Sequence, residues 1–356
     1  MAGGRLFHGV AIAWAVALCA FAVPAAADTF APDSYVEQPL APDAPIDPNS
    51  ATMVQRVVNE VTTGMTLSNP QKPNVDYQWC APRVYTVTAA QPYVHVNLPS
   101  DASPALKEQL EWVPIPPHAN TVPASACGDR PLVIWQPSTN TVWDMWVAGK
   151  DALGQWSARY GGKIGSSVLK PELRNVAQNP GHWEDPPFGY GRRFGTAATS
   201  IPKISGLPRI AEIQAGEVDH VINIQLGKPG PCWRWPAQRM DGIINSTVND
   251  AAAPPYGSIL RLPANLNIDA MNISRFTKAL AKGAQKHGMV VNDRGRVGFG
   301  VEVPPRLLGE PGHANDPDPY VPYFDGRSGP QIVAEFPWDQ LQVLAPKQGT
   351  QACQTQ

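Results

Sequence analysis

Hydrophobic and polar positions alternate with a period of two along much of this chain, a pattern typical of β-strands that bury one face. The clearest example is a hairpin expected over 132–136 and 141–147, around Pro137-Ser138-Thr139-Asn140. A second hairpin is expected between 289–292 and 297–301. Further strands are expected over 84–87, 93–98, 218–226, 333–336 and 342–343.

Helical spacing is confined to a few short segments. The best lies over 274–287, where Ser274 can cap the N-terminus and Gly288 can supply the left-handed residue that ends a helix. The stretch 161–190 is rich in Gly, Pro and Asn and is too irregular for regular structure. Shorter helices are expected over 51–64, 105–112 and 207–215.

Many strands, few helices and long Pro-rich loops predict a mainly β fold, a jelly-roll-like sandwich of two sheets. The chain has 356 residues, of which 39 are Pro and only 16% are charged. Because Pro costs roughly 3 kcal/mol inside a helix, this composition disfavours a long helical protein. We expect one such domain over 51–345, a Pro/Ala/Asp-rich spacer or surface loop over 28–50, and a tail over 346–356.

The first 27 residues predict a secretory signal peptide. Arg5 gives a positive start, residues 10–23 form an uncharged apolar run, and Ala25-Ala26-Ala27 is a small-residue cleavage site. The alternative is a membrane anchor, but the run is shorter than the roughly 20 residues that span a bilayer. We therefore expect a secreted protein, extracellular or associated with the cell envelope, with no membrane span after cleavage.

Four cysteines remain after removal of this peptide, and in an exported chain they predict two disulfides. Of the three possible pairings, sequence proximity favours Cys80–Cys127 with Cys232–Cys353. The seven His residues are scattered and no CxxC occurs, so we expect neither a metal nor a cofactor. The net charge of −2 gives no reason to expect nucleic-acid binding.

Candidate catalytic residues lie on two predicted strands. Asp144 and Trp146 share one strand face, and a carboxylate beside an indole is typical of sugar-binding sites. Asp219 follows Glu217 on a second strand, with His220 on the opposite face. Since glycoside hydrolysis uses two carboxyls roughly 5–10 Å apart, we expect Asp144 and Asp219 to form the acid pair, with His220 as a lyase-type base. The structural alternative places these residues in the core or in loop contacts.

Aromatic and basic residues around these acids are expected to bind substrate, because flat rings stack on sugars and cations orient anionic groups. Three of them lie in or beside the irregular stretch 161–190, where binding loops tend to occur. The alternatives are a solvated loop and Trp side chains that only fill a core. The expected substrate-binding residues are Trp146, Trp183, Tyr190, Arg193, Trp235, Arg239 and Asp241.

Several phrases together resemble a group of secreted bacterial proteins without a firmly assigned activity. They are VPIPPHA at 113–119, LVIWQPSTNTVWDMW at 132–146, FGTAATSIPKISG at 194–206, EVDHVINI at 217–224, WPAQRMDG at 235–242 and KHGMVVNDRG at 286–295. The resemblance spans about 113–300 and implies a single secreted β-sandwich domain. It also implies that an acid is maintained at Asp144, where relatives carry Glu, and it assigns no role to any residue.

Together these observations predict a secreted polysaccharide-processing protein, a glycoside hydrolase or a polysaccharide lyase, that binds an extended extracellular or cell-envelope glycan. Two alternatives use the same residues differently. A non-catalytic glycan-binding or envelope-binding protein would use the aromatic residues without an acid pair. A structural surface protein would bury its Trp residues and carry no site.

Overall fold

The computed structural model describes residues 34–63, 73–165, 195–240, 250–347 and 351–353, together with Met1 and Phe30. The expected signal peptide lies outside these residues, apart from Met1. Over the described ranges the protein is rich in strands, which form four sheets, and its helices are few and short. None of the helices in these ranges is long and apolar enough to cross a membrane.

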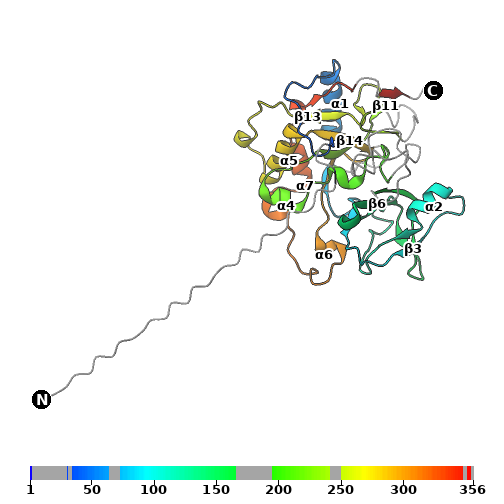
Figure 1. The fold of residues 1–356 in the computed structure, drawn as a ribbon. Coiled ribbons are helices and arrows are strands. Elements are labelled where there is room, and N and C mark those ends of the chain that lie inside the picture. Colours follow the sequence, from blue (N-terminus) through cyan, green and yellow to red (C-terminus); the bar gives the residue numbers. More distant parts are fainter. Residues whose placement is uncertain are drawn as a thin grey trace.

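The largest sheet organises the part of the molecule that carries most of the helices (Figure 1). Its strands lie in the order β1-β15-β10-β14-β13-β16. In the order of their position across the sheet they are β1 (Asn74–Asp76), β15 (Gly298–Gly300), β10 (Ile222–Leu226), β14 (Met289–Arg294), β13 (Ile259–Arg261) and β16 (Gln342–Val343).

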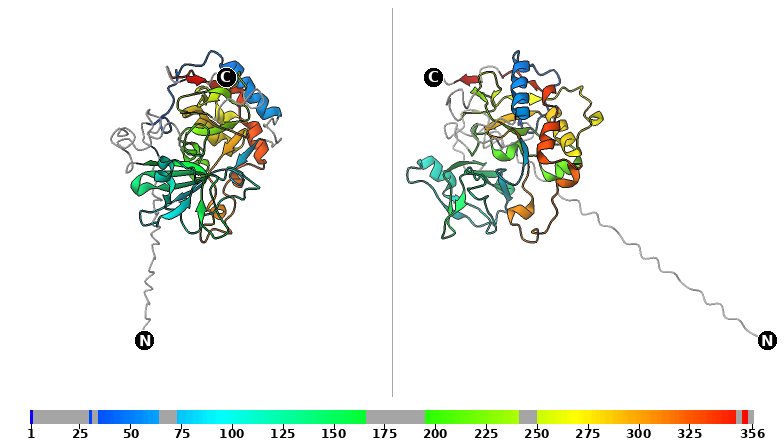
Figure 2. Two further views of the ribbon diagram at one scale, coloured as in Figure 1. Left: turned by 90° about the vertical axis from the view of Figure 1, so that its right-hand side faces the viewer. Right: turned by 180° about the vertical axis from the view of Figure 1, so that it is seen from behind.

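The two faces of this sheet differ in chemistry. In β10, Ile222, Ile224 and Leu226 are buried, while Asn223 and Gln225 between them are only half-buried. The apolar face packs in the largest core cluster, to which helices contribute Val57, Leu280 and Val333, among others. Figure 2 shows these helices gathered on one side of the molecule. They are α1 (Ser50–Thr63), α4 (Ile210–Ala215), α5 (Arg275–Lys286) and α7 (Gly329–Glu335).

A second core cluster lies in the part built mainly from residues 81–158, which includes α2 (Pro104–Leu110). Helix α6 (Pro305–Leu308) also contributes to this cluster. One four-stranded sheet there consists of β2 (Arg83–Thr86), β5 (Leu132–Gln136), β6 (Thr141–Trp146) and β9 (Tyr160–Gly165). The other consists of β4 (Trp112–Val113), β3 (Val94–Asn97), β8 (Trp156–Ser157) and β7 (Gly149–Lys150). The three-stranded sheet consists of β12 (Pro255–Tyr256), β11 (Gly230–Arg234) and β17 (Gln351–Cys353).

The predicted elements that depend on residues close together in the sequence are confirmed. Strands β5 and β6 form the expected hairpin, with Leu132 opposite Met145 and Gln136 opposite Thr141. Helix α5 begins after Ser274, whose hydroxyl accepts the Thr277 N–H. A positive φ of 83° at Gly288 follows the end of the helix.

Two predicted strand features are wrong. Strands β14 and β15 do not pair with each other, because β10 lies between them, parallel to β14 and antiparallel to β15. Residues 333–336 belong largely to helix α7, which begins after Ser328 in a capping box with Gln331. Strand β10 also begins at Ile222, so the expected strand from 218 starts four residues later. The first residues of the stretch 161–190 belong to β9 rather than to an irregular segment.

The two-sheet jelly roll is not confirmed. Jelly rolls are antiparallel architectures, whereas five strand pairs here are parallel. These pairs are β1 with β15, β10 with β14, β2 with β5, β3 with β8, and β11 with β12. Alternation identifies strands but carries no information about which distant strand is the partner, so the mainly β composition was predictable and the pairing was not.

The Cys80–Cys127 disulfide is present as predicted. Cys232 is also disulfide-bonded, and its register partner across the β11–β17 pair is Cys353. Residues 34–49, expected as a spacer or a surface loop, contact the body. The carboxylate of Asp47 forms a buried ion pair of 3.1 Å with Arg234.

Because the two faces of the sheet differ, we expect substitutions at neighbouring positions of β10 to lower the free energy of unfolding by different amounts. Ile224→Ala is expected to lower the free energy of unfolding by about 2–5 kcal/mol, because it leaves a cavity in the core. Gln225→Ala, on the polar face, is expected to lower it by less than about 1 kcal/mol. Urea denaturation of both variants measures this. Equal losses would contradict the assignment of the two faces.

Candidate functional site

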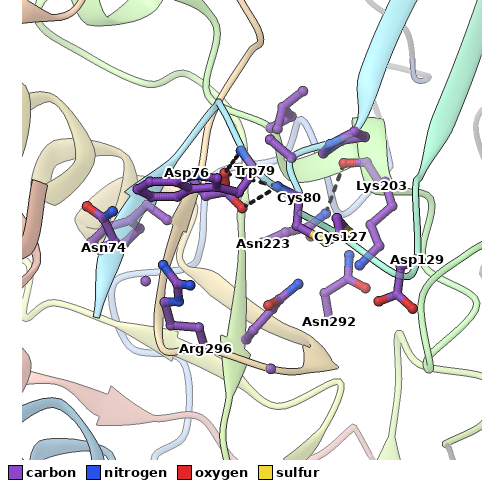
Figure 3. Close-up of a pocket in the computed structure, with 18 of the residues that line it drawn as sticks. Asn74, Asp76, Trp79, Cys80, Cys127, Asp129, Lys203, Asn223, Asn292 and Arg296 are labelled. Carbon is purple, nitrogen blue, oxygen red and sulfur yellow. Dashed lines mark hydrogen bonds between the residues drawn. A yellow bond between two sulfur atoms is a disulfide. The ribbon is translucent and has the colours of Figure 1, made fainter. Parts of the chain in front are cut away.

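A cavity of about 450 Å³ lies over the polar face of the six-stranded sheet (Figure 3). Its floor comes from alternate positions of three strands: Asn74 and Asp76 of β1, Asn223 and Gln225 of β10, and Asn292 and Arg294 of β14. Its walls include Trp79, the Cys80–Cys127 disulfide and Asp129. The same alternation that directs apolar side chains toward the helices therefore directs amide groups into the cavity.

A β-bulge places Asn292 in this floor. The register shifts so that Ile224 pairs with Val291 and Gln225 pairs with Asp293, which leaves Asn292 without a Cα partner. The Thr199 hydroxyl donates to the carbonyl oxygen of Asn292 at 2.7 Å. The Asn292 side chain is buried, yet its Nδ2 has no hydrogen-bond partner.

Asn223 shows the same incomplete pairing. Its Nδ2 donates weakly to the carbonyl oxygens of Pro202 and Lys203, both at 3.4 Å, while its buried Oδ1 has no partner. Buried polar atoms are almost always hydrogen-bonded in folded proteins, so an unpaired donor and an unpaired acceptor on two residues of one cavity floor are unusual.

Lys203 supplies the positive charge at one end of the cavity, where Figure 3 shows it beside Asp129 and Asn292. Its Nζ lies 2.5 Å from Oδ2 of Asp293. Burial alone would lower the pKa of Lys203, but the nearby carboxylates of Asp293, Asp144 and Asp129 outweigh it and raise that pKa. Lys203 therefore stays protonated.

Two predicted site residues lie behind this end of the cavity and do not line it. Asp144 is fully buried, and its Oδ2 accepts the backbone N–H of Lys203 at 3.1 Å. Burial raises the pKa of Asp144, and the Lys203 backbone hydrogen bond opposes that effect. The indole N–H of Trp146 donates to Oδ1 of Asp129 at 2.9 Å. Both residues thus position groups that do line the cavity.

An aromatic side chain and a cation form the opposite end. Trp79 is 41% exposed, and the Arg296 guanidinium lies 5.5 Å from the centre of its ring. Asp76 accepts the backbone N–H groups of Trp79 and Cys80, both at 2.9 Å, so its carboxylate holds the loop that carries the indole. Figure 3 shows Trp79, Asp76 and Arg296 together on this side.

The expected acid pair is not brought together. Asp144 is buried on β6, whereas Asp219 is exposed beside the C-terminal end of α5, where it forms an ion pair with Lys286 and a hydrogen bond with Nε2 of His287. The hydrogen bond from Lys286 lowers the pKa of Asp219 most strongly. Among the described residues, the hydrogen-bond and ion-pair partners of the two carboxylates differ.

His220 lies elsewhere, in the wall of a second cavity of about 210 Å³. Its Nε2 is 3.1 Å from Oε2 of Glu212, and its Nδ1 is 2.6 Å from the Val221 carbonyl oxygen. Glu212 also accepts the Arg209 backbone N–H at the start of α4. Through these contacts His220 helps to hold the start of α4, and it lies away from Asp144.

Of the remaining predicted residues, the two that the structure describes, Arg239 and Trp235, do not line the larger cavity either. Arg239 donates to the Ser200 hydroxyl and the Ala197 carbonyl oxygen, both at 2.8 Å. These hydrogen bonds hold the 195–201 segment in place. The Trp235 ring packs against Tyr35 with a centroid distance of 5.2 Å. Trp183, Tyr190, Arg193 and Asp241 lie outside the described residues.

Sequence reasoning missed the floor of the cavity. A usable signal was present, because amides at alternate positions of the INIQL segment interrupt an otherwise apolar strand. Such a strand has one polar face that needs partners. Lys203 and Arg296 carried no comparable signal, because Lys203 begins a 3-10 helix of only four residues and Arg296 lies in the connection between β14 and β15.

No family model, curated protein or solved structure matches this chain. The resemblance to secreted bacterial proteins therefore stays a prediction. Over the part of the chain that the structure describes, no group of three or more His, Cys, Asp or Glu side chains could hold a metal ion.

The Glu212 contacts predict an acid-dependent stability. Burial would raise the pKa of Glu212, but hydrogen bonds from His220 and Arg209 lower it far below the usual 4.5. A depressed folded-state pKa gives stability that is present above pH 4.5 and lost as the pH falls below it. Glu212→Gln should lower the free energy of unfolding at pH 7 and weaken its decline below pH 4.5, measured by denaturation across pH.

Glu217→Gln is the matched control for this measurement, because the Glu217 carboxylate is exposed and its ion pair is with the surface side chain of Lys286. It should leave both the neutral-pH stability and the acid dependence close to wild type. An acid dependence in Glu212→Gln as steep as that of the wild type would contradict the linkage.

Proposed function

We propose that this protein is a secreted polysaccharide-processing protein that binds a short segment of a glycan in the cavity over the polar face of the six-stranded sheet. The observation that carries the proposal is the amide-rich floor, in which Asn223 and Asn292 each leave a buried polar atom unpaired. An amide side chain both donates and accepts hydrogen bonds, as sugar hydroxyl groups do.

The other features of the cavity support a sugar ligand. Trp79 offers an exposed ring at one wall, and an aromatic face can stack on a pyranose. A volume of about 450 Å³ lies within the range of roughly 300–1,000 Å³ that small-molecule sites occupy. A glycan segment would thus contact the amides below it and the indole beside it.

The charged groups favour bond cleavage by elimination over hydrolysis by a carboxyl pair. The two carboxylates that line the cavity, Asp76 and Asp129, lie at opposite ends in Figure 3, and Asp76 is occupied by loop N–H groups. We assign Asp129 as the group that exchanges a proton with the substrate. Its carboxylate removes a C–H proton, the electron pair forms a C=C bond as the glycosidic C–O bond breaks, and the resulting carboxylic acid returns the proton to the leaving oxygen. Lys203, with its raised pKa, is a poor proton donor and suits electrostatic stabilisation of developing negative charge.

Trp79→Ala tests where the glycan binds. Loss of the stacking surface should weaken binding about five- to tenfold, measured by calorimetry with the tightest ligand from a polysaccharide panel. Trp112→Ala is the matched control, because Trp112 is 56% exposed but lies on β4, away from the cavity. Equal effects of the two variants would contradict binding in this cavity.

Asp129→Asn tests the chemistry. The purified protein is incubated with the panel, and both reducing ends and unsaturated products are scored. Asp129→Asn should lower product formation about 100-fold or more while glycan affinity stays within about twofold. Binding without product in the wild type would support the non-catalytic alternative, and neither binding nor product would contradict a glycan function.

A further inference from the structure

Two arginines contribute positive charge to the cavity, and one of them, Arg296, lies against the Trp79 ring. Arg294 and Arg296 both line the cavity. Among the residues that the structure describes, neither guanidinium forms an ion pair. Both residues are half-buried, so their guanidinium groups are partly solvated and can bind a negatively charged ligand that enters the cavity.

The acidic residues nearby are already engaged. Asp293 pairs with Lys203 at 2.5 Å, so these two charges compensate each other at the far end. Asp76 accepts the N–H groups of its own loop and attracts Arg296 only through space. Asp129 lies with Lys203 and accepts the Trp146 indole N–H. The two arginines therefore carry one more charge than the single carboxylate of Asp76 balances.

The turn that carries the two arginines is held in place. The N–H of Gly295, between them, donates to the Leu226 carbonyl oxygen at 3.0 Å. Gly295 packs so closely on the Gln225 amide that a Cβ there would lie 2.3 Å from Oε1. The Arg296 guanidinium is further restrained against the Trp79 ring. A fixed backbone therefore carries both guanidinium groups beside the amide side chains of the cavity floor.

We propose that the glycan bound here is anionic, and that Arg294 and Arg296 bind an acidic group on the sugar that stacks on Trp79. A guanidinium presents paired N–H donors that match a carboxylate or a sulfate, and such charge-assisted hydrogen bonds are stronger than neutral ones. This inference rests on the proposed function and narrows its substrate to acidic polysaccharides.

The test compares acidic oligosaccharides with uncharged forms of the same backbone. The full-length mature protein is titrated calorimetrically with oligogalacturonate, alginate and hyaluronan oligomers, each beside its carboxyl-reduced form, and with a sulfated galactan oligomer. The wild type should bind at least one acidic oligomer about tenfold or more tightly than its reduced form. Preference for the sulfated oligomer would identify sulfate as the acidic group.

Arg294→Gln and Arg296→Gln should each weaken binding of the acidic oligomer about tenfold or more and leave affinity for its reduced form within about twofold. Arg159→Gln is the matched control, because the Arg159 side chain is exposed and does not line the cavity. It should bind both forms as the wild type does. Far-ultraviolet circular dichroism and melting temperature confirm that each variant is folded.

Equal affinity of the wild type for acidic and reduced oligomers would overturn this inference and leave the proposed glycan function standing. The inference is overturned in the same way if Arg294→Gln and Arg296→Gln weaken binding of both forms equally. Failure to bind any oligomer, acidic or neutral, would instead contradict the proposed function itself.

Discussion

The structure depends on a single constraint, the opposite chemistry of the two faces of the six-stranded sheet. One face is apolar and buries its side chains against the helices, so the sheet cannot slip by one residue without exposing its core. The other face then necessarily presents Asn223, Gln225 and Asn292 to the cavity. The stability of the sheet and the presence of a polar site are thus consequences of the same register.

The buried charges around Lys203 connect this sheet with the neighbouring β5–β6 hairpin. Asp293 comes from β14 and Asp144 from β6, and the segment that carries Lys203 lies between them. A buried charge is costly when it is unpaired, and removing one member leaves the others uncompensated. The cluster therefore fixes how the two sheets meet and keeps a protonated amine at the end of the cavity.

The elements that could be predicted from the sequence are those that depend on residues close to one another along the chain. The β5–β6 hairpin follows from alternation around a Pro-containing turn, and α5 follows from Ser274 and Gly288. The insertion of β10 between β14 and β15 depends on tertiary packing, which local alternation does not encode. The site was missed for the same reason, because its floor combines strands that are distant in sequence, and Asp144 proved to support Lys203 rather than to face the cavity.

The most direct test is a crystal structure of the protein with an acidic oligosaccharide bound. We expect sugar hydroxyl groups on the side-chain amides of Asn223 and Asn292, a ring stacked on Trp79, and an acidic group on Arg294 and Arg296. Sugar bound instead in the smaller cavity beside His220, or on the surface beside Asp219, would contradict this expectation.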